Sequence, residues 1–179
     1  FPTALESPRV RFTFRDEDTD EMFNGWVVRQ DRYVAGLGDW YKKKGIIPGS
    51  LISVKKSALA GEVLIRCERS RQNKEWLKTV LVGSDKGIVF AMLKHPIEVG
   101  FNERMALVIP DVYALDRVWK EREKIDAEKI FMQIVHELAK LNPQGHIHAQ
   151  ELYAAVNVVF RCPPSSVLFF LLNNPAFQH

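Results

Sequence analysis

The sequence predicts an α+β protein with a β-barrel or pseudobarrel-like N-terminal domain, a connecting helix and a C-terminal helical module. Short apolar segments separated by glycine and proline turns fill the first 110 residues. After Asp111 the pattern changes to helical periodicity, which Asn142-Pro143 and Pro163-Pro164 interrupt. The expected parts are a barrel-like domain at 1–110, a connecting helix at 111–125 and a three-helix, winged-helix-like module at 126–179.

The first half reads as a series of short strands. Residues 10–14 and 25–30 are expected to be strands on either side of the acidic loop DEDTDE at 16–21. Tyr33 to Lys44 is expected to be a short helical or turn-rich segment, and Pro48-Gly49 a turn. Further strands are expected at 51–56, 62–68, 76–82, 88–93 and 105–110, with hairpins joining the first two and the next two, and a basic loop at 69–75.

Two apolar runs in the second hairpin, residues 80–82 and 88–90, predict strands that are buried on both faces. In the earlier hairpin, alternation predicts Val63, Ile65 and Cys67 on one face.

The second half reads as helices. Asp111 can N-cap a helix that begins at Val112, and helical periodicity continues to Leu141. The charged stretch between two apolar stripes is either a solvated linker helix or a break at Ile125-Asp126. A second helix is expected at 149–160, and a very apolar third helix at 165–174 with Pro164 in its first turn.

Composition places the chain among globular proteins. Its 179 residues are 46% hydrophobic and 26% charged, and no apolar run approaches the length of a membrane span. We recognise no signal-peptide pattern, and a start at Phe1 suggests a piece of a longer chain. Cys67 and Cys162 are expected to be reduced core thiols, which favours an intracellular location, cytoplasmic or nuclear/nucleoid.

Positive charge is concentrated in the middle of the chain. Residues 29–78 hold twelve basic and five acidic groups, whereas residues 1–28 carry a net charge of −3. A positive field attracts polyanions, so we expect nucleic-acid contacts here, against the alternative of a solvated surface. The candidate contacts are Lys42, Lys43, Lys44, Lys55, Lys56, Arg66, Arg69, Arg71, Lys74 and Lys78. Gln72 and Asn73 could read base edges; Trp40, Tyr41 and Trp76 could stack on bases but are more often core.

Residues 10–68 resemble the B3-type DNA-binding pseudobarrel. The matching residues are Asp16, Gly25, Trp26, Tyr33, Gly38, Trp40, Tyr41, Ile46, Pro48, Gly49, Leu51 and Ile52. The resemblance implies a pseudobarrel that binds double-stranded DNA. Three features depart from it. Gly49-Ser50 stands where the family has Gly-Asp, and the loop that would face the groove is acidic. The upstream strands that would carry the family's other DNA-contacting arm are expected to precede Phe1 or to be absent.

Residues 126–179 resemble a winged helix of the HARE type. The matching segments are IFMQIVHELAKL, GHIHAQELYAAVNVV, PPSSVLFFLLNN and AFQH, after which a wing would follow. However, residues 164–174 contain no basic residue, and their five apolar residues from Leu168 to Leu172 cannot all face a three-helix core. This segment therefore favours a protein partner over DNA.

The sequence contains no catalytic or cofactor motif that we recognise. His146 and His148 have no further ligands at metal-binding spacing, so a helix-cap or loop role is expected, and no metal or small-molecule ligand is evident. A nuclease could use Asp16 and Asp18 with a lysine, but residues 62–66 do not supply that lysine. Three hypotheses remain. The first is a non-enzymatic nucleic-acid-binding protein, related to transcription or restriction. The second is a protein-interaction scaffold, and the third is the DNA-recognition part of a nuclease whose catalytic domain lies outside this chain.

Overall fold

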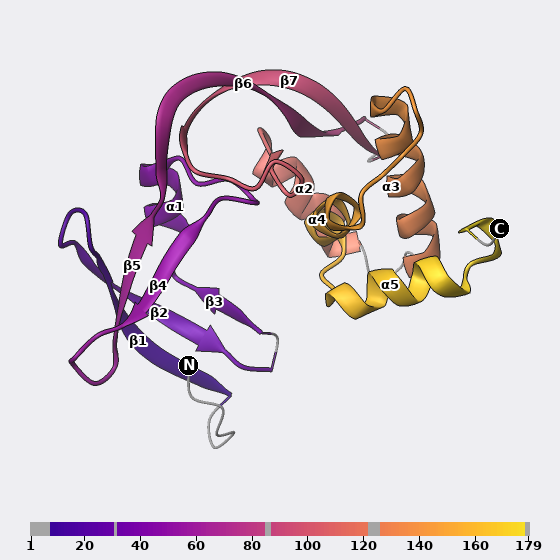
Figure 1. The fold of residues 1–179 in the computed structure, drawn as a ribbon. Helices are drawn as coiled ribbons and strands as arrows, with labels where there is room; N and C mark the ends of the chain where they lie inside the picture. The colour runs from indigo at the N-terminus through magenta and orange to yellow at the C-terminus, as the bar shows by residue number, and fades with distance from the viewer. Residues whose placement is uncertain (1–7, 31, 85–86, 122–125, 178–179) are drawn as a thin grey trace. The chain divides into compact units, whose positions relative to one another are not determined.

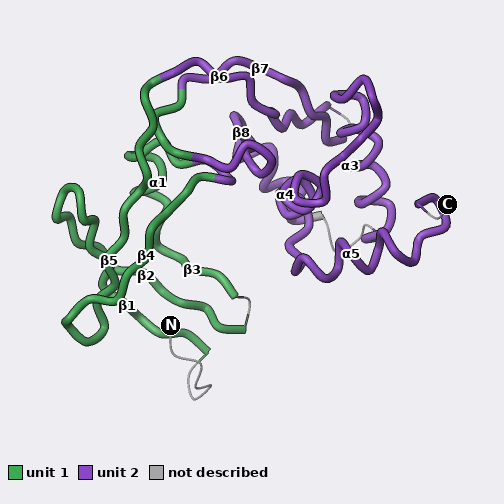
Figure 2. The backbone as a smooth tube through the Cα atoms, in the orientation of Figure 1, with its two compact units in different colours: residues 1–46, 50–72, 97–100 green, residues 47–49, 73–96, 101–179 purple. Residues whose placement is uncertain are grey.

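The computed structural model describes residues 8–30, 32–84, 87–121 and 126–177 (Figure 1). It has the predicted α+β architecture, with a strongly curled, half-barrel sheet followed by a small second sheet and helices toward the C-terminus. Two compact units interleave along the chain (Figure 2). Unit 1 comprises residues 1–46, 50–72 and 97–100, and unit 2 comprises 47–49, 73–96 and 101–179. The boundaries that we expected at residues 110 and 125 stay predictions.

Unit 1 is built on a mixed five-stranded sheet in the order β3-β2-β1-β5-β4. β1 pairs antiparallel with β2 and parallel with β5, and β4 pairs antiparallel with β5 as the predicted hairpin. Val63, Ile65 and Cys67 share a buried face, as predicted. The strands are β1 (Arg9–Asp16), β2 (Met22–Val28), β3 (Tyr33–Ala35), β4 (Ile52–Lys56) and β5 (Glu62–Cys67).

The short helix α1 (Gly38–Lys44) packs on this sheet through Trp40, whose side chain is buried. The rings of Phe14, Phe23 and Trp40 follow one another at centroid separations of 6.0 and 6.3 Å. Gly45 ends the helix in the left-handed conformation, with φ of 65°, which glycine adopts without steric cost. A Cβ at residue 25 would lie 2.4 Å from the Phe14 ring, so the position of that ring requires glycine at residue 25.

The second sheet contains β6 (Arg69–Val82), β7 (Ile88–Val99) and β8 (Leu107–Val108), in the order β7-β6-β8. The prediction of a basic loop at residues 69–75 is wrong, because these residues form the first half of β6. The prediction failed because a strand without a buried face has no apolar periodicity. β7 accommodates Pro96 because it is an edge strand, where a missing N–H is tolerated.

The expectation that residues 80–82 and 88–90 are buried on both faces is also wrong. Leu81 and Val89 are 39% and 43% exposed, while Val80, Ile88 and Phe90 are buried. The strands alternate between core and solvent, as in an antiparallel sheet with one covered face.

Unit 2 contains α2 (Val112–Glu121), α3 (Ala127–Leu141), α4 (Ala149–Val159), α5 (Pro164–Asn173) and the 3-10 turn η2 (Pro175–Phe177). The Asp111 carboxylate accepts the Ala114 N–H at 2.8 Å, which confirms the predicted cap. Asp126 caps α3, in agreement with a break at Ile125-Asp126, although residues 122–125 lie outside the described part. One core joins the sheet and the helices, and its most buried members include Leu107, Ile134, Leu138, Ala155, Val156 and Val167.

Cys67 and Cys162 are buried free thiols, as expected. Among the described residues, no single helix is long and apolar enough to cross a membrane; α4 and α5 together pass on length and composition but are bent by 112° at the break between them.

Candidate functional site

Cations surround the acidic loop that connects β1 and β2. Each of the five carboxylates at residues 16–21 lies within ion-pair distance of a basic side chain. The pairs are Asp16 and Asp18 with Lys44, Asp18 with Arg69, Glu17 with Lys55, Asp20 with Arg15, and Glu21 with Lys43. The loop that the sequence placed opposite phosphates therefore neutralises part of the predicted phosphate-binding set.

Asp16 is the buried centre of this network. Its side chain is fully buried, and its Oδ2 atom lies 2.6 Å from the Lys44 Nζ atom and accepts the Trp40 Nε1–H at 2.7 Å. Its Oδ1 atom accepts the Asp18 backbone N–H at 2.9 Å. Burial alone would raise the pKa of Asp16, but the adjacent Lys44 ammonium and the hydrogen bonds from Trp40 and Asp18 lower it to about 2. This ionised carboxylate joins α1 to the end of β1.

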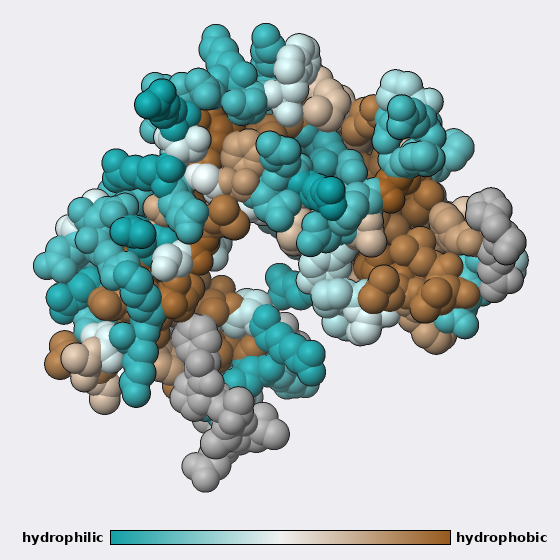
Figure 3. All heavy atoms as spheres, in the orientation of Figure 1, coloured by the Kyte–Doolittle hydropathy of each residue, from teal (hydrophilic) through white to brown (hydrophobic). Residues whose placement is uncertain are grey.

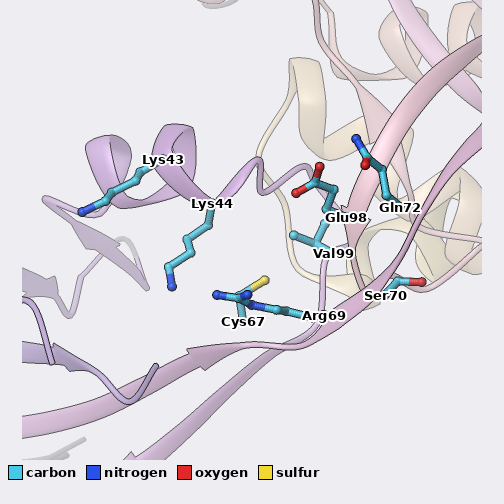
Figure 4. Close-up of a pocket in the computed structure, with 8 residues that line it drawn as sticks. All are labelled: Lys43, Lys44, Cys67, Arg69, Ser70, Gln72, Glu98 and Val99. Carbon is cyan, nitrogen blue, oxygen red and sulfur yellow. The ribbon is translucent and has the colours of Figure 1, made fainter. Parts of the chain in front are cut away.

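A cavity of about 360 Å³ lies beside Lys44 in unit 1 (Figure 4). In the figure, Lys44 extends from the end of α1 toward Arg69 and Cys67, whereas Lys43 extends away from them. Its lining residues are Lys43, Lys44, Cys67, Arg69, Ser70, Gln72, Glu98 and Val99. Because Asp16 and Asp18 already face Lys44 and Arg69, the cavity offers donors and acceptors of mixed sign. Burial raises the pKa of the Cys67 thiol, so this thiol stays protonated at neutral pH.

The ten candidate contacts divide into two groups. Five of them face a carboxylate: Lys43, Lys44, Lys55, Arg69 and Lys78. The other five are exposed and have no ion pair with any described residue: Lys42, Lys56, Arg66, Arg71 and Lys74. The second group leaves its charge available to an external anion.

The structure brings some of the candidates together and separates others. Lys43, Lys44, Lys55 and Arg69 gather around the acidic loop. Lys55 and Lys56 are consecutive strand residues, so they point to opposite faces of β4. Lys78 belongs to unit 2, where its side chain is only 11% exposed and its Nζ atom lies 2.9 Å from the Glu151 carboxylate.

Of the three aromatic residues that the sequence favoured as core, two are exposed. Trp40 is in the core, but Tyr41 is 37% exposed and Trp76 is 59% exposed. The Lys94 Nζ atom lies 5.2 Å from the centroid of the Trp76 ring. Sequence reasoning missed Lys94 because it lies just beyond the strand predicted at 88–93, and no local pattern indicated that β7 continues to Val99.

The last helix, α5, presents an apolar surface. Leu168, Phe169 and Leu172 are 52%, 69% and 74% exposed, and hydrophobic residues gather over this helix in Figure 3. Phe170 and Leu171 face inward instead, with the Phe170 ring centroid 4.7 Å from that of Phe131. The prediction that these five residues cannot all face the core is confirmed.

The His148 side chain caps α4 by accepting the Gln150 N–H, as the expected cap role requires. Among the described residues, no group of three or more histidine, cysteine or acidic side chains is arranged to hold a metal ion. No protein-family model matches the sequence, and neither curated proteins nor solved structures give a match.

Proposed function

We propose that this protein binds double-stranded DNA without catalysing a reaction, through cations of unit 1. The observation that carries the proposal is the set of exposed, unpaired cations Lys42, Arg66 and Arg71. Their charges have no carboxylate within ion-pair distance in the described residues. Phosphates are the natural partners of such groups, because each neutralised phosphate releases condensed counterions.

Some of the cations that make ion pairs can also contribute to DNA binding. Lys43 and Lys55 make ion pairs with Glu21 and Glu17 at the surface, where such pairs contribute about 0–1 kcal/mol. A DNA phosphate can replace these carboxylates at little cost. The Lys44 side chain is 10% exposed and contacts a fully buried carboxylate, so it keeps its internal partner.

The curled sheet of unit 1 agrees with a B3-like pseudobarrel. Gly25 and Trp40, two residues that carry the resemblance, have packing roles, because one makes room for the Phe14 ring and the other anchors α1. Relation to the B3 family remains part of this proposal. The same applies to a HARE-type relation for the helices of unit 2.

Fluorescence anisotropy with a labelled duplex tests DNA binding at several salt concentrations. The triple variant Lys42→Ala/Arg66→Ala/Arg71→Ala removes three unpaired cations and should weaken binding. It should also reduce the slope of log K against log salt by about 2.7, at 0.9 per phosphate contact. A wild-type protein that does not bind duplex at low salt overturns the proposal.

The matched control removes the same charge from unit 2. Arg117, Lys120 and Lys129 are exposed helix residues, and the triple variant that replaces them with Ala should leave the salt slope unchanged. If both triple variants weaken binding equally, only net charge matters and the proposed surface is wrong.

A second candidate function is protein interaction through α5. The exposed stripe of Leu168, Phe169 and Leu172, on a helix without a charged residue, favours it. Sedimentation of the wild type and of Phe169→Ser should show self-association that the substitution removes. Asp16 and Asp18 make ion pairs with Lys44 and Arg69, so we do not propose them as catalytic carboxylates.

A further inference from the structure

Trp76 of β6 and Lys94 of β7 form an exposed aromatic and cationic pair within unit 2. The ring is 59% exposed, and the Lys94 ammonium lies 5.2 Å from its centroid. Lys74 lies two residues before Trp76 in the same strand, so both side chains leave the same face. Lys74 is exposed and has no ion pair with a described residue. The Trp76 ring therefore has one cation against it and a second on the same face of β6.

A cavity of about 230 Å³ adjoins the Trp76 ring. Its apolar wall combines an exposed aromatic side chain with a flexible thioether and small aliphatic groups. These residues are Trp76, Leu77, Met92, Ala106, Leu138 and Leu141, and the polar ones are Lys78, Glu103, Asn142 and Glu151. A cavity that combines apolar walls with polar groups can hold a small molecule or a base.

Most polar groups of this cavity already have partners. The Lys78 ammonium lies 2.9 Å from the Glu151 carboxylate. The Asn142 amide donates to the His146 carbonyl and accepts the Gln144 N–H. Glu103 is exposed, and no described residue forms an ion pair or side-chain hydrogen bond with it. Glu103 is therefore the acceptor that remains for a ligand.

We propose that this cavity binds an unstacked nucleobase of a single-stranded nucleic acid, an inference that rests on the proposed nucleic-acid binding but uses different residues. The base stacks on Trp76 in place of the Lys94 ammonium, because every base has an aromatic face. Lys74 and Lys94 contact the flanking phosphates through their long, mobile side chains. Glu103 accepts a hydrogen bond from an exocyclic amine, so adenine and cytosine bind better than thymine, which has none.

Labelled single-stranded (dA), (dC) and (dT) oligonucleotides of equal length, with a blunt duplex beside them, test this proposal by anisotropy. The wild type should bind (dA) and (dC) more tightly than (dT). Trp76→Leu should weaken (dA) binding by about tenfold, since stacking on one aromatic residue contributes about 1–3 kcal/mol. Because the ring is mostly exposed, the thermal unfolding midpoint should stay unchanged.

Two further variants make the test specific. Trp26→Leu removes a tryptophan of unit 1 that is 45% exposed and should leave (dA) binding unchanged. Glu103→Ala removes the acceptor and should reduce the preference for (dA) over (dT) without changing duplex binding. Equal losses from Trp76→Leu and Trp26→Leu, or no loss from either, overturn the inference.

The duplex arm separates this inference from the proposed function. Duplex binding without single-strand binding refutes the base site alone. Single-strand binding that depends on Trp76, together with no duplex binding, refutes the proposed duplex surface alone. No binding of either nucleic acid refutes both.

Discussion

Replacing Asp16 by Asn tests whether the buried ion pair with Lys44 holds α1 on the sheet. Asn has nearly the same shape and can still accept the Trp40 indole N–H, but it leaves the Lys44 ammonium without its nearest counter-charge. Removing one partner of a buried pair typically costs about 3–5 kcal/mol of folding free energy. Asp18 lies 3.8 Å from the same ammonium, so we expect the lower end, about 3 kcal/mol.

The pH dependence of stability gives a second value for the stabilising contribution of the Asp16 carboxylate. The pKa of Asp16 is lowered from 3.8 to about 2 in the folded protein, so its stabilising contribution is fully present above the unfolded value. It is lost as pH falls from about 4 through about 2. Each pKa unit corresponds to about 1.4 kcal/mol, which gives a contribution of about 2 kcal/mol. The wild type loses this contribution near pH 2, so its stability should fall toward that of Asp16→Asn, which lacks the contribution at every pH.

Urea unfolding followed by NMR measures these quantities within unit 1, using the Trp40 indole signal and the amides of β1 and β5. Asp18→Asn is the matched control, because its carboxylate side chain is 26% exposed and should contribute less than about 1 kcal/mol. Lys44→Met combined with Asp16→Asn should recover part of the loss, since no unpaired buried charge remains. If Asp16→Asn costs no more than Asp18→Asn at neutral pH, the ion pair does not have the structural role that we infer.

Three other variants test further parts of the structure. Gly25→Ala places a Cβ 2.4 Å from the Phe14 ring and should lower the free energy of unfolding by about 1–3 kcal/mol, measured in urea; an unchanged midpoint would contradict this packing. Glu17→Gln with Glu21→Gln removes the two carboxylates that compete with phosphates for Lys43 and Lys55, so duplex binding should tighten. Looser binding would show that the loop itself contacts DNA. Phe169→Ser should leave the free energy of unfolding within about 0.5 kcal/mol while reducing self-association; a large loss of stability would place this ring in the core.

Local rules correctly predicted the elements that bury one face. Alternation placed Val63, Ile65 and Cys67 in the core, and the cap at Asp111 and the Pro164 start of α5 follow from backbone chemistry. These features depend on neighbouring residues in the chain. A single sequence contains that information.

Features that depend on distant partners were not predictable in the same way. The first half of β6 has no buried face, so its strand forms by pairing with β7 and not by an apolar pattern. Trp76 is exposed although large aromatic residues are usually buried. The pairing of Lys55 with Glu17 joins residues 38 positions apart, and no local pattern indicates it.

The distribution of charge along the chain shows most directly that contacts between distant residues cannot be predicted from local sequence patterns. The acidic N-terminal segment and the basic middle segment were separate in the sequence, but the fold brings the acidic loop against Lys43, Lys44, Lys55 and Arg69. If all ten predicted cations contacted phosphates, the salt slope would be about −9, whereas Lys42, Arg66 and Arg71 alone give about −2.7. A measured slope near the smaller value means that the loop keeps its cations when DNA binds. A slope well beyond it means that phosphates displace the carboxylates, so the strength of binding would depend on how easily this loop releases them.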